Sequence, residues 1–249
     1  MNSISIPKDI EQRIRQAVQQ FWSTRDAQIT HQEANVFSEQ GNRGAVTGGK
    51  QLDGFVELLR CILIENGVRD EHIFCNAKLE LPGFYRPSKK WDLLVVDKKK
   101  LVLAIELKSQ VGPSFGNNFN NRTEEAMGSS LDIWTAFREG LFRDSAPWLG
   151  YFMLLEDCAG SSTPVSIRSP HFSVMAEFEN SSYTKRYEVF CNKLVLERQY
   201  HAACFLTTRR NEASTGGFAV PSEKLSMVSF LSSMLAAIFA HRAMNGGEM

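Results

Sequence analysis

The sequence lacks a charge imbalance, because 28 lysine and arginine residues are offset by 28 aspartate and glutamate residues. A neutral total argues against a histone-like protein that holds nucleic acid by bulk charge alone, although a local basic cleft on a neutral protein can still bind DNA. Hydrophobic residues make up 43% of the 249 positions, which is enough to bury a sizeable core. The length fits one large domain or two small ones.

Cysteine is scarce and shows no pairing pattern. The five cysteines are odd in number and include no Cys-x-x-Cys pair, which argues against a disulfide framework and against a zinc site. Such cysteines are typical of small core residues in a reducing cytoplasm. The five histidines are scattered without the spacing of metal ligands, so we assign them no catalytic role.

Long hydrophobic runs and targeting signals are also missing. Residues 1–9 contain no basic segment followed by an apolar one, so we expect no signal peptide. The most apolar run, residues 225–240, is interrupted by serines and is short for a bilayer span. We interpret this run as a buried or dimer-interface helix and expect no membrane contact.

The spacing of apolar residues predicts the order of the elements. Helical spacing predicts helices that begin at Pro7, at residues 55–63, 127–141 and 183–194, and from Ser222. Runs rich in Val, Leu and Ile predict strands at residues 73–81, 91–96, 101–107, 148–155 and 202–207. Polar residues 24–50 and Gly/Asn-rich residues 112–121 are expected to be loops, with Asn121 capping the next helix. This order predicts an α/β fold with a central mixed β-sheet flanked by helices.

Three residues that suit phosphodiester chemistry fall on two neighbouring predicted strands. Glu106 and Lys108 are two positions apart, so on a strand they point to the same face. Asp92 reaches that face only if the paired residues of the two antiparallel strands have position numbers with an even sum. This condition requires an odd-length turn, such as residues 97–99 or 97–101, or a β-bulge.

On a shared face these residues have the chemistry of a metal-dependent nuclease. Asp92 and Glu106 would hold Mg²⁺, a hard cation that prefers oxygen ligands, and the backbone carbonyl of Leu107 would add another ligand. Lys108 would place a water molecule and stabilise the negative charge that grows on phosphorus. The metal would lower the pKa of that water, and in-line attack would leave a 5′-phosphate and a 3′-hydroxyl. The alternative is a solvated ion pair between Glu106 and Lys108 on a sheet protein unrelated to DNA.

Two segments resemble a known nuclease superfamily. Residues 89–96 (KKWDLLVV) and 106–110 (ELKSQ) resemble the core of the PD-(D/E)XK nucleases, although Trp91 stands where a proline usually precedes the aspartate. Residues 116–126 (GNNFNNRTEEA) resemble more narrowly the XhoI-type restriction endonucleases, and we judge the likeness to cover most of the chain.

This resemblance implies a PD-(D/E)XK restriction-endonuclease-like fold and a type II site-specific deoxyribonuclease. It implies a single restriction endonuclease domain over residues 1–249, with a catalytic core near residues 50–156 and the remaining segments for DNA recognition and dimerisation. It also implies a homodimer that reads the palindrome 5′-CTCGAG-3′ in double-stranded DNA and cuts after the first C to leave 5′ overhangs. A two-fold dimer explains physically why a palindrome is read. The biology of such enzymes adds a bacterial cytoplasmic location and a DNA methyltransferase in the same host, as a functional rather than a physical partner.

Two residues near the three catalytic candidates are further candidates. Glu57 lies away from the apolar face of its predicted helix and could lend the metal an extra carboxylate, as a helix before the sheet does in related nucleases; the alternative is a solvated glutamate. Gln110 continues the face of Glu106 and Lys108 and could hold a metal-bound water or a phosphate; the alternative is a polar residue that ends the strand.

Other residues are candidates for DNA contact. Asparagine amides can pair with an adenine edge, and arginine can bind guanine or phosphate. The alternatives are a turn, a helix cap, a solvated basic run or an exposed loop. The candidates after the strand of Glu106 are Asn117, Asn118, Asn120, Asn121 and Arg122, those before Asp92 are Arg86, Lys89 and Lys90, and those after the last strand are Arg209 and Arg210.

Two other functions share most of these features. A repair or junction-resolving nuclease of the same fold would recognise DNA shape without reading six bases. A non-catalytic DNA-binding module would keep the fold without the chemistry, but the presence of Asp92, Glu106 and Lys108 argues against it. The sequence leaves open whether one or two metals bind at each site.

Overall fold

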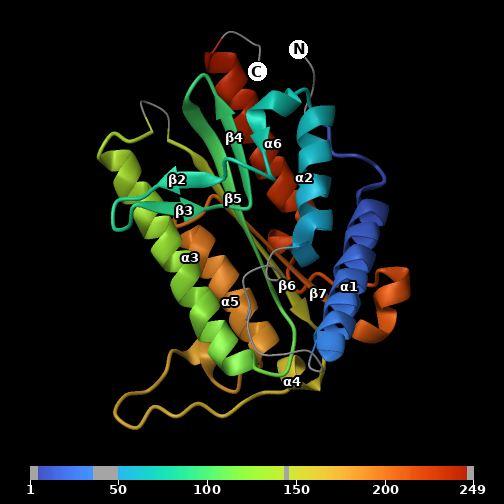
Figure 1. The fold of residues 1–249 in the computed structure, drawn as a ribbon. Coiled ribbons are helices and arrows are strands. Elements are labelled where there is room, and N and C mark those ends of the chain that lie inside the picture. The colour runs from blue at the N-terminus through green and yellow to red at the C-terminus, as the bar shows by residue number, and fades with distance from the viewer. Residues whose placement is uncertain (1–4, 36–49, 143–145, 246–249) are drawn as a thin grey trace.

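The computed structural model describes residues 5–35, 50–142 and 146–245, and a five-stranded mixed sheet runs through it (Figure 1). The strand order is β1-β4-β5-β6-β7, with β1, β4 and β5 antiparallel and β5, β6 and β7 parallel. The strands are β1 Ile73–Phe74, β4 Leu93–Asp97, β5 Lys100–Gln110, β6 Trp148–Glu156 and β7 Ala202–Thr208. The predicted mixed sheet is confirmed.

Helices cover both faces of this sheet. They are α1 Ile10–Asn35, α2 Asp53–Glu65, α3 Phe115–Arg138, α4 Ala159–Ser162, α5 Tyr183–Leu196 and α6 Met227–Met244. Short 3₁₀ turns are η1 Lys50–Leu52, η2 Asp70–His72, η3 Ala176–Phe178, η4 Arg210–Thr215 and η5 Glu223–Leu225. A separate hairpin of β2 Glu80–Pro82 and β3 Ser88–Lys90 lies beside α3 (Figure 1).

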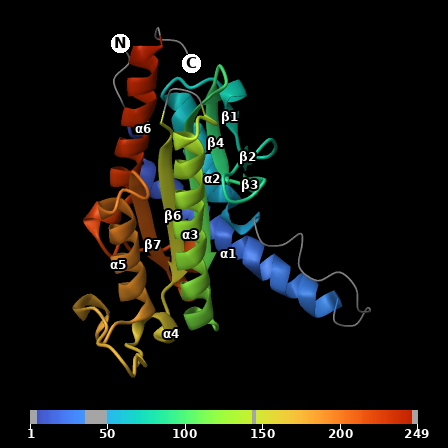
Figure 2. The same ribbon diagram turned by 90° about the vertical axis from the view of Figure 1, so that its left-hand side faces the viewer.

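The core has two halves because apolar residues fill both faces of β5. Leu103 and Ile105 belong to the half that packs against α1, α2 and α6. Ala104, on the opposite face, belongs to the half that packs against α3 and α5. In Figure 2, α3 stands in front of the strands on this second side. Since side chains alternate along a strand, residues 106 and 108 share the face of Ala104.

Helix α6 is the one helix in the described part of the chain whose length and composition would allow a membrane span. Its residues Phe230, Leu231 and Met234 are fully buried against the sheet, as in the core helix of a globular protein. The expectation of a buried helix here is confirmed for this face. Ser226 caps the helix, which begins five positions after the Ser222 expected from sequence.

Two predicted loops are partly wrong. Residues 24–35 continue α1, while residues 36–49 of the same predicted loop lie outside the described residues. Residues 115–121 begin α3 rather than a loop, so Asn121 lies inside the helix and does not cap it. Tertiary packing outweighs the poor helix propensity of asparagine here, because Phe115 stacks on Tyr183 and Phe119 meets Tyr187 edge to face.

The predicted strand at residues 73–81 is also wrong as a single element. Its ends form β1 and β2, which belong to different sheets, and residues 75–79 between them form no strand. The break lets the β2–β3 hairpin leave the main sheet and approach α3. The chain then returns to the sheet at β4, directly after Asp92.

Candidate active site

A bulge in the β4–β5 hairpin sets the face on which Asp92 lies. The hairpin closes with the two-residue turn Lys98-Lys99, both with positive φ (47° and 65°), so the odd-length turn expected from sequence is wrong. An even turn alone would put Asp92 and Glu106 on opposite faces. The register shifts between Val95 and Val96, however, and this bulge restores the required parity.

Beyond the bulge, Asp92 lies opposite Glu106 at the point where β4 begins. Leu93 pairs with Ile105, and the Asp92 N–H donates to the Ile105 carbonyl at 3.2 Å. The Asp92 carboxylate supplies the acceptor that a backbone carbonyl would supply in a longer strand, because Asp92 Oδ2 accepts the Leu107 N–H at 2.7 Å. The predicted convergence of Asp92 with Glu106 on one face is therefore confirmed, through the bulge.

Glu106 is a buried carboxylate with two ammonium partners. Its side chain is only 2% exposed. Glu106 Oε1 lies 2.7 Å from Lys108 Nζ, and Glu106 Oε2 lies 2.5 Å from Lys89 Nζ. Lys108 also lies 3.7 Å from Glu125 of α3. A buried charge is tolerated only when paired, and here the two lysines provide the pairing.

These contacts set the protonation states of the three groups. Burial raises the pKa of Asp92, although the hydrogen bond from the Leu107 N–H opposes that rise. Burial would also raise the pKa of Glu106, but the charges of Lys108 and Lys89 outweigh it and hold that pKa below its ordinary value. Burial would lower the pKa of Lys108, but Glu106 outweighs it and raises that pKa. Glu106 and Lys108 are therefore an ionised pair.

Lys89 does not stand where the sequence suggested. We expected it to approach DNA phosphates, but its ammonium group binds Glu106 and lies 4.3 Å from the ring centre of Trp91. Its side chain is 12% exposed. The reason is the β2–β3 hairpin, which folds the chain before Asp92 back over β5. Its neighbour Lys90 is exposed, lines the pocket beside the site and forms no ion pair in the described part of the chain.

A pocket of about 210 Å³ opens beside Asp92 and Lys108. Its wall includes Gln51 and Asp53, which precede and begin α2. Burial raises the pKa of Asp53. Glu57, the candidate predicted from sequence, lies one helical turn later, but it pairs with Arg60 at 2.9 Å and does not line the pocket. The carboxylate that α2 brings to this pocket is Asp53, and its place in the first helical turn was the signal that was missed.

Helix α3 brings further residues to the site. Arg122 lines the same pocket and pairs with Glu125 at 2.7 Å. Glu125 was not among the residues singled out from sequence, although it stands three positions after Arg122. Four asparagines precede this pair on the first two turns of α3. Those with exposed side chains are Asn117, Asn120 and Asn121, while Asn118 is half-buried.

Two other residues expected to contact DNA or a metal-bound water, Gln110 and Arg86, form hydrogen bonds within the protein instead. The Gln110 amide donates to the Phe115 carbonyl at 3.0 Å and accepts from the Tyr187 hydroxyl. Because Gln110 is buried and bonded through both ends of its amide, the expectation that it holds a phosphate or a metal-bound water is wrong. Arg86 donates to Asp132 of α3 at 2.8 Å, so its charge is paired with that helix rather than free for phosphate.

The last two basic candidates lie just after β7. Arg209 pairs with Asp157 at 2.7 Å, and its side chain is 58% exposed. Arg210 forms an ion pair with Asp26 of α1 and lies over the Trp22 ring. Both arginines are exposed at the edge where the parallel strands end. Neither contacts Asp92, Glu106 or Lys108.

The oxygen donors at the site fit a hard divalent cation. Asp92 and Glu106 lie opposite each other on neighbouring strands, and the charge of Glu106 acts on Asp92. The N–H and C=O of one strand residue point to the same side, so the Leu107 carbonyl faces the edge where its N–H meets Asp92. No group of three His, Cys, Asp or Glu side chains in the described segments is arranged for a metal. Mg²⁺ needs no such group, because it keeps several waters and binds through one or two carboxylates.

Comparisons with known proteins identify the family of the chain. The family model of restriction endonuclease XhoI matches residues 31–220. The chain is 50% identical over 212 residues to type II restriction enzyme BstVI of Geobacillus stearothermophilus, covering 83% of this chain and 95% of the relative. It is 48% identical over 186 residues to type II restriction enzyme XhoI of Xanthomonas vasicola, covering 74% of each chain.

A third relative, type II restriction enzyme AbrI of Azospirillum brasilense, is 46% identical over 166 residues, which cover 66% of this chain and 74% of the relative. No solved structure matches the chain. The family model covers most of the sequence, and the resemblance seen in residues 116–126 is confirmed. The chain belongs to the XhoI family of type II restriction endonucleases.

Proposed function

We propose that this protein cuts double-stranded DNA within the palindrome 5′-CTCGAG-3′, after the first C, in a reaction that depends on Mg²⁺. Membership of the XhoI family supports the activity, and the resemblance to that family supports the recognition sequence. The mixed sheet with its paired carboxylates supports a PD-(D/E)XK fold.

One observation carries the proposal. Asp92, Glu106 and Lys108 meet beside one pocket, at the point where β4 begins and β5 continues. The two-residue turn could close a regular ladder without a bulge, and that ladder would place Asp92 and Glu106 on opposite faces. The bulge places them on the same face. Residues 89 and 125 add one positive and one negative charge around the same carboxylate and ammonium pair.

Each side chain has a distinct part in the reaction. Asp92, Glu106 and the Leu107 carbonyl would hold Mg²⁺, which when bound would neutralise the phosphate and lower the pKa of a coordinated water. Lys108 places its ammonium group next to the reacting phosphate and stabilises the negative charge that develops there. Glu106 keeps Lys108 charged for that role, as its raised pKa indicates. Arg122 is placed to bind a neighbouring phosphate from the wall of the pocket.

The remaining segments would serve recognition and assembly. The exposed asparagines at the start of α3 would reach base edges, and Lys90, Arg209 and Arg210 would contact the DNA backbone. We assign the catalytic core to residues 50–156 of a single domain that acts as a homodimer. The bacterial relatives support a role in the cytoplasm of a bacterium, where a DNA methyltransferase protects the host's own sites.

A plasmid with one CTCGAG site tests the proposal directly. With Mg²⁺ the wild-type protein should give one linear product with 5′-phosphate, four-base overhangs, and no product with EDTA. Random fragments, or cutting that requires branched DNA, would contradict sequence-specific restriction and support a repair or junction nuclease.

Glu106→Ala should reduce the cleavage rate at least about a thousandfold, because one metal-binding carboxylate and the partner of Lys108 are both lost. Glu57→Ala is the matched control, since it removes an exposed glutamate outside the site, and it should cut like the wild type. Full activity of the Glu106 variant would refute the proposed site. Circular dichroism of both variants shows whether the fold is kept.

A further inference from the structure

We propose that two copies of this chain pair through the outer face of α3 and the adjoining end of α5. This face is defined by Met127, Gly128 and Leu131 of α3, by Leu196 at the end of α5 and by residues 197–198 after it. The inference rests on the proposed function, because a palindrome is read by a two-fold dimer. It goes further by naming the surface through which the dimer forms.

The first observation is exposed apolar area on α3. Met127 is 48% exposed, Leu131 is 51% exposed, and Leu196 at the end of α5 is 76% exposed. Gly128 lies between the two α3 residues on the same face, and a Cβ atom added there would meet nothing within 4 Å. A side-chain-free position on an apolar helix face allows a second helix to approach closely.

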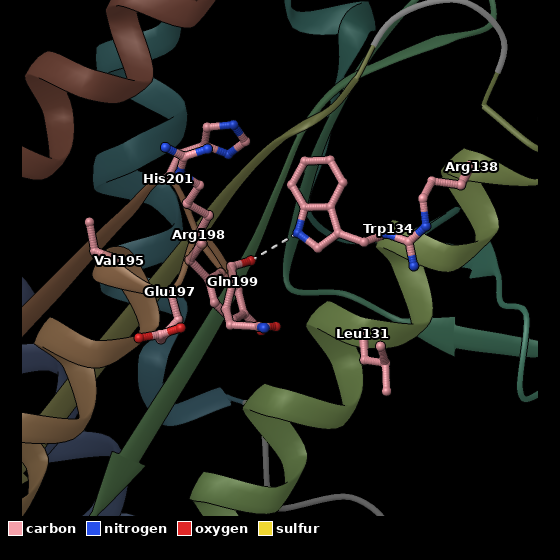
Figure 3. Close-up of a pocket in the computed structure, with 9 residues that line it drawn as sticks. Leu131, Trp134, Arg138, Val195, Glu197, Arg198, Gln199 and His201 are labelled. Carbon is pink, nitrogen blue, oxygen red and sulfur yellow. Dashed lines mark hydrogen bonds between the residues drawn. The ribbon is translucent and has the colours of Figure 1, made fainter.

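The second observation is a pocket along this face. It has a volume of about 600 Å³ and is bounded by α3 on one side and by the end of α5 and the segment after it on the other. Figure 3 shows Leu131, Trp134 and Arg138 on α3 facing the segment that carries Glu197 and Gln199. The Trp134 indole donates to the Gln199 carbonyl at 3.0 Å, so the wall of this pocket is fixed. An apolar side chain of a second copy would fill the space that Leu131 borders.

The third observation is that this surface carries charged side chains of both signs, which a second copy of the same surface could pair with. Arg138 and Arg198 carry positive charge at the pocket, Glu197 carries negative charge there, and the exposed Glu139 follows Arg138 at the end of α3. None of these four forms an ion pair in the described part of the chain. A two-fold axis brings each patch against its own copy. Unpaired charges of both signs on one small surface can therefore pair across such an axis.

The position of the catalytic residues favours this face over α6. The exposed side of α6 carries Val228, Ala236 and Phe239 without a charged residue, but it covers the opposite face of the sheet from Asp92 and Glu106. Helix α3 lies on the catalytic face, and its Glu125 contacts Lys108. Six residues of helix separate Glu125 from Leu131, about 9 Å along the axis. The two scissile phosphates would be four base pairs apart, about 14 Å along the DNA, so the paired sites need to lie near the two-fold axis.

Molar mass in solution tests the inference without DNA or metal. We expect the full-length wild-type chain to have a mass of 2 × 28.1 = 56.2 kDa by light scattering coupled to gel filtration. Leu131→Glu places a charge at the centre of the proposed interface and should halve that mass. Phe239→Glu is the matched control, because it makes the same change at the similarly exposed α6 face, and it should leave the dimer intact.

Three results would overturn the inference: a monomeric wild type, a dimeric Leu131→Glu variant, or a Phe239→Glu variant that dissociates as readily as Leu131→Glu. Thermal unfolding followed by circular dichroism identifies a variant that has failed to fold, and Met127→Lys then replaces Leu131→Glu. Because the mass is measured apart from cleavage, loss of the proposed interface and loss of the proposed nuclease activity are distinguishable results.

Discussion

At Glu106 two ammonium groups share one buried carboxylate. Lys108 binds one oxygen and Lys89 binds the other. The same carboxylate is a proposed ligand of Mg²⁺, and an ammonium group at 2.5 Å occupies the position that a cation would need. We therefore expect Lys89 to compete with the metal at Glu106, whereas the proposed role of Lys108 is at the phosphate.

Lys89→Met should tighten Mg²⁺ binding to the DNA-free protein about tenfold, which corresponds to 1.4 kcal/mol. The methionine keeps the apolar stem against Trp91 but removes the competing charge. Isothermal titration calorimetry with Mg²⁺ measures the change. Lys90→Met, the exposed neighbour without an ion pair, should bind Mg²⁺ like the wild type. Weaker binding by the Lys89 variant would show that this lysine supports the metal instead.

Sequence reasoning succeeded at single residues where spacing within one strand decides the outcome. Glu106 and Lys108 share a face because they are two positions apart on β5. It failed where a partner comes from another element, as for Lys89, which the hairpin brings to Glu106 of β5, and for Gln110, whose amide meets Tyr187 of α5. Such partners depend on tertiary packing, which a local pattern does not encode.

At the level of elements, the β2–β3 hairpin is held to α3 by one carboxylate. Asp132 Oδ1 accepts the N–H groups of Phe84 and Tyr85, both at 2.8 Å, and Oδ2 accepts from Arg86. A Cβ atom at Gly83 would lie 2.4 Å from Asp132 Oδ2, so glycine is required there. The hairpin carries Lys89, and Asp132 thereby sets the position of that lysine over Glu106.

Asp132→Ala should lower the free energy of unfolding by about 3 kcal/mol at pH 7, because three donors lose a charged acceptor. Urea denaturation of the variant and the wild type measures this difference in the free energy of unfolding. Burial would raise the pKa of Asp132, but its bonds from Tyr85 and Arg86 outweigh burial and lower that pKa below 3.8. The stabilisation is therefore complete above pH 3.8 and is lost as the pH falls through the lowered value. The difference between variant and wild type should shrink accordingly.

Glu124→Ala is the control on the same helix, since Glu124 is exposed, and it should change stability by less than about 0.5 kcal/mol. An Asp132 variant as stable as the wild type at pH 7 would show that the hairpin is anchored elsewhere.

The long apolar strands were predictable as elements, and the asparagine-rich segment was not. Strands β5, β6 and β7 are continuous runs of buried residues, and their composition alone identifies them. The first turns of α3 have a loop-like composition, but Phe115 and Phe119 dock on α5 and turn the segment into helix. As a result the asparagines stand on a rigid helix beside the site.

At the level of the whole molecule, the zero net charge makes DNA affinity depend on local basic residues. Arg122 and the exposed Lys90 line the pocket beside the site, and Arg209 is exposed after β7. Composition indicated only that bulk charge was absent. The distribution of the basic groups follows from the fold, because they come from segments far apart in the chain.

Arg122→Gln should reduce the slope of log affinity against log salt by about one, because one phosphate contact is lost. Fluorescence anisotropy with a duplex containing CTCGAG, in Ca²⁺ to prevent cutting, measures the slope. Arg15→Gln, which removes an arginine paired on the outside of α1, should leave the slope unchanged. An unchanged slope for Arg122→Gln would place the arginine away from the DNA backbone.

The irregularity in the β4–β5 ladder lies on the β5 side, because Val95 pairs with Leu103 while Val96 pairs with Leu101, which leaves Val102 without a partner. Deleting Val102 would give a regular ladder around the same two-residue turn and would keep Asp92 opposite Glu106. Moving the extra residue into the turn would have the same outcome, so relatives can differ in loop length here and still hold both carboxylates on one face. A one-residue change on the β4 side alone would instead shift Asp92 along the ladder to a different partner.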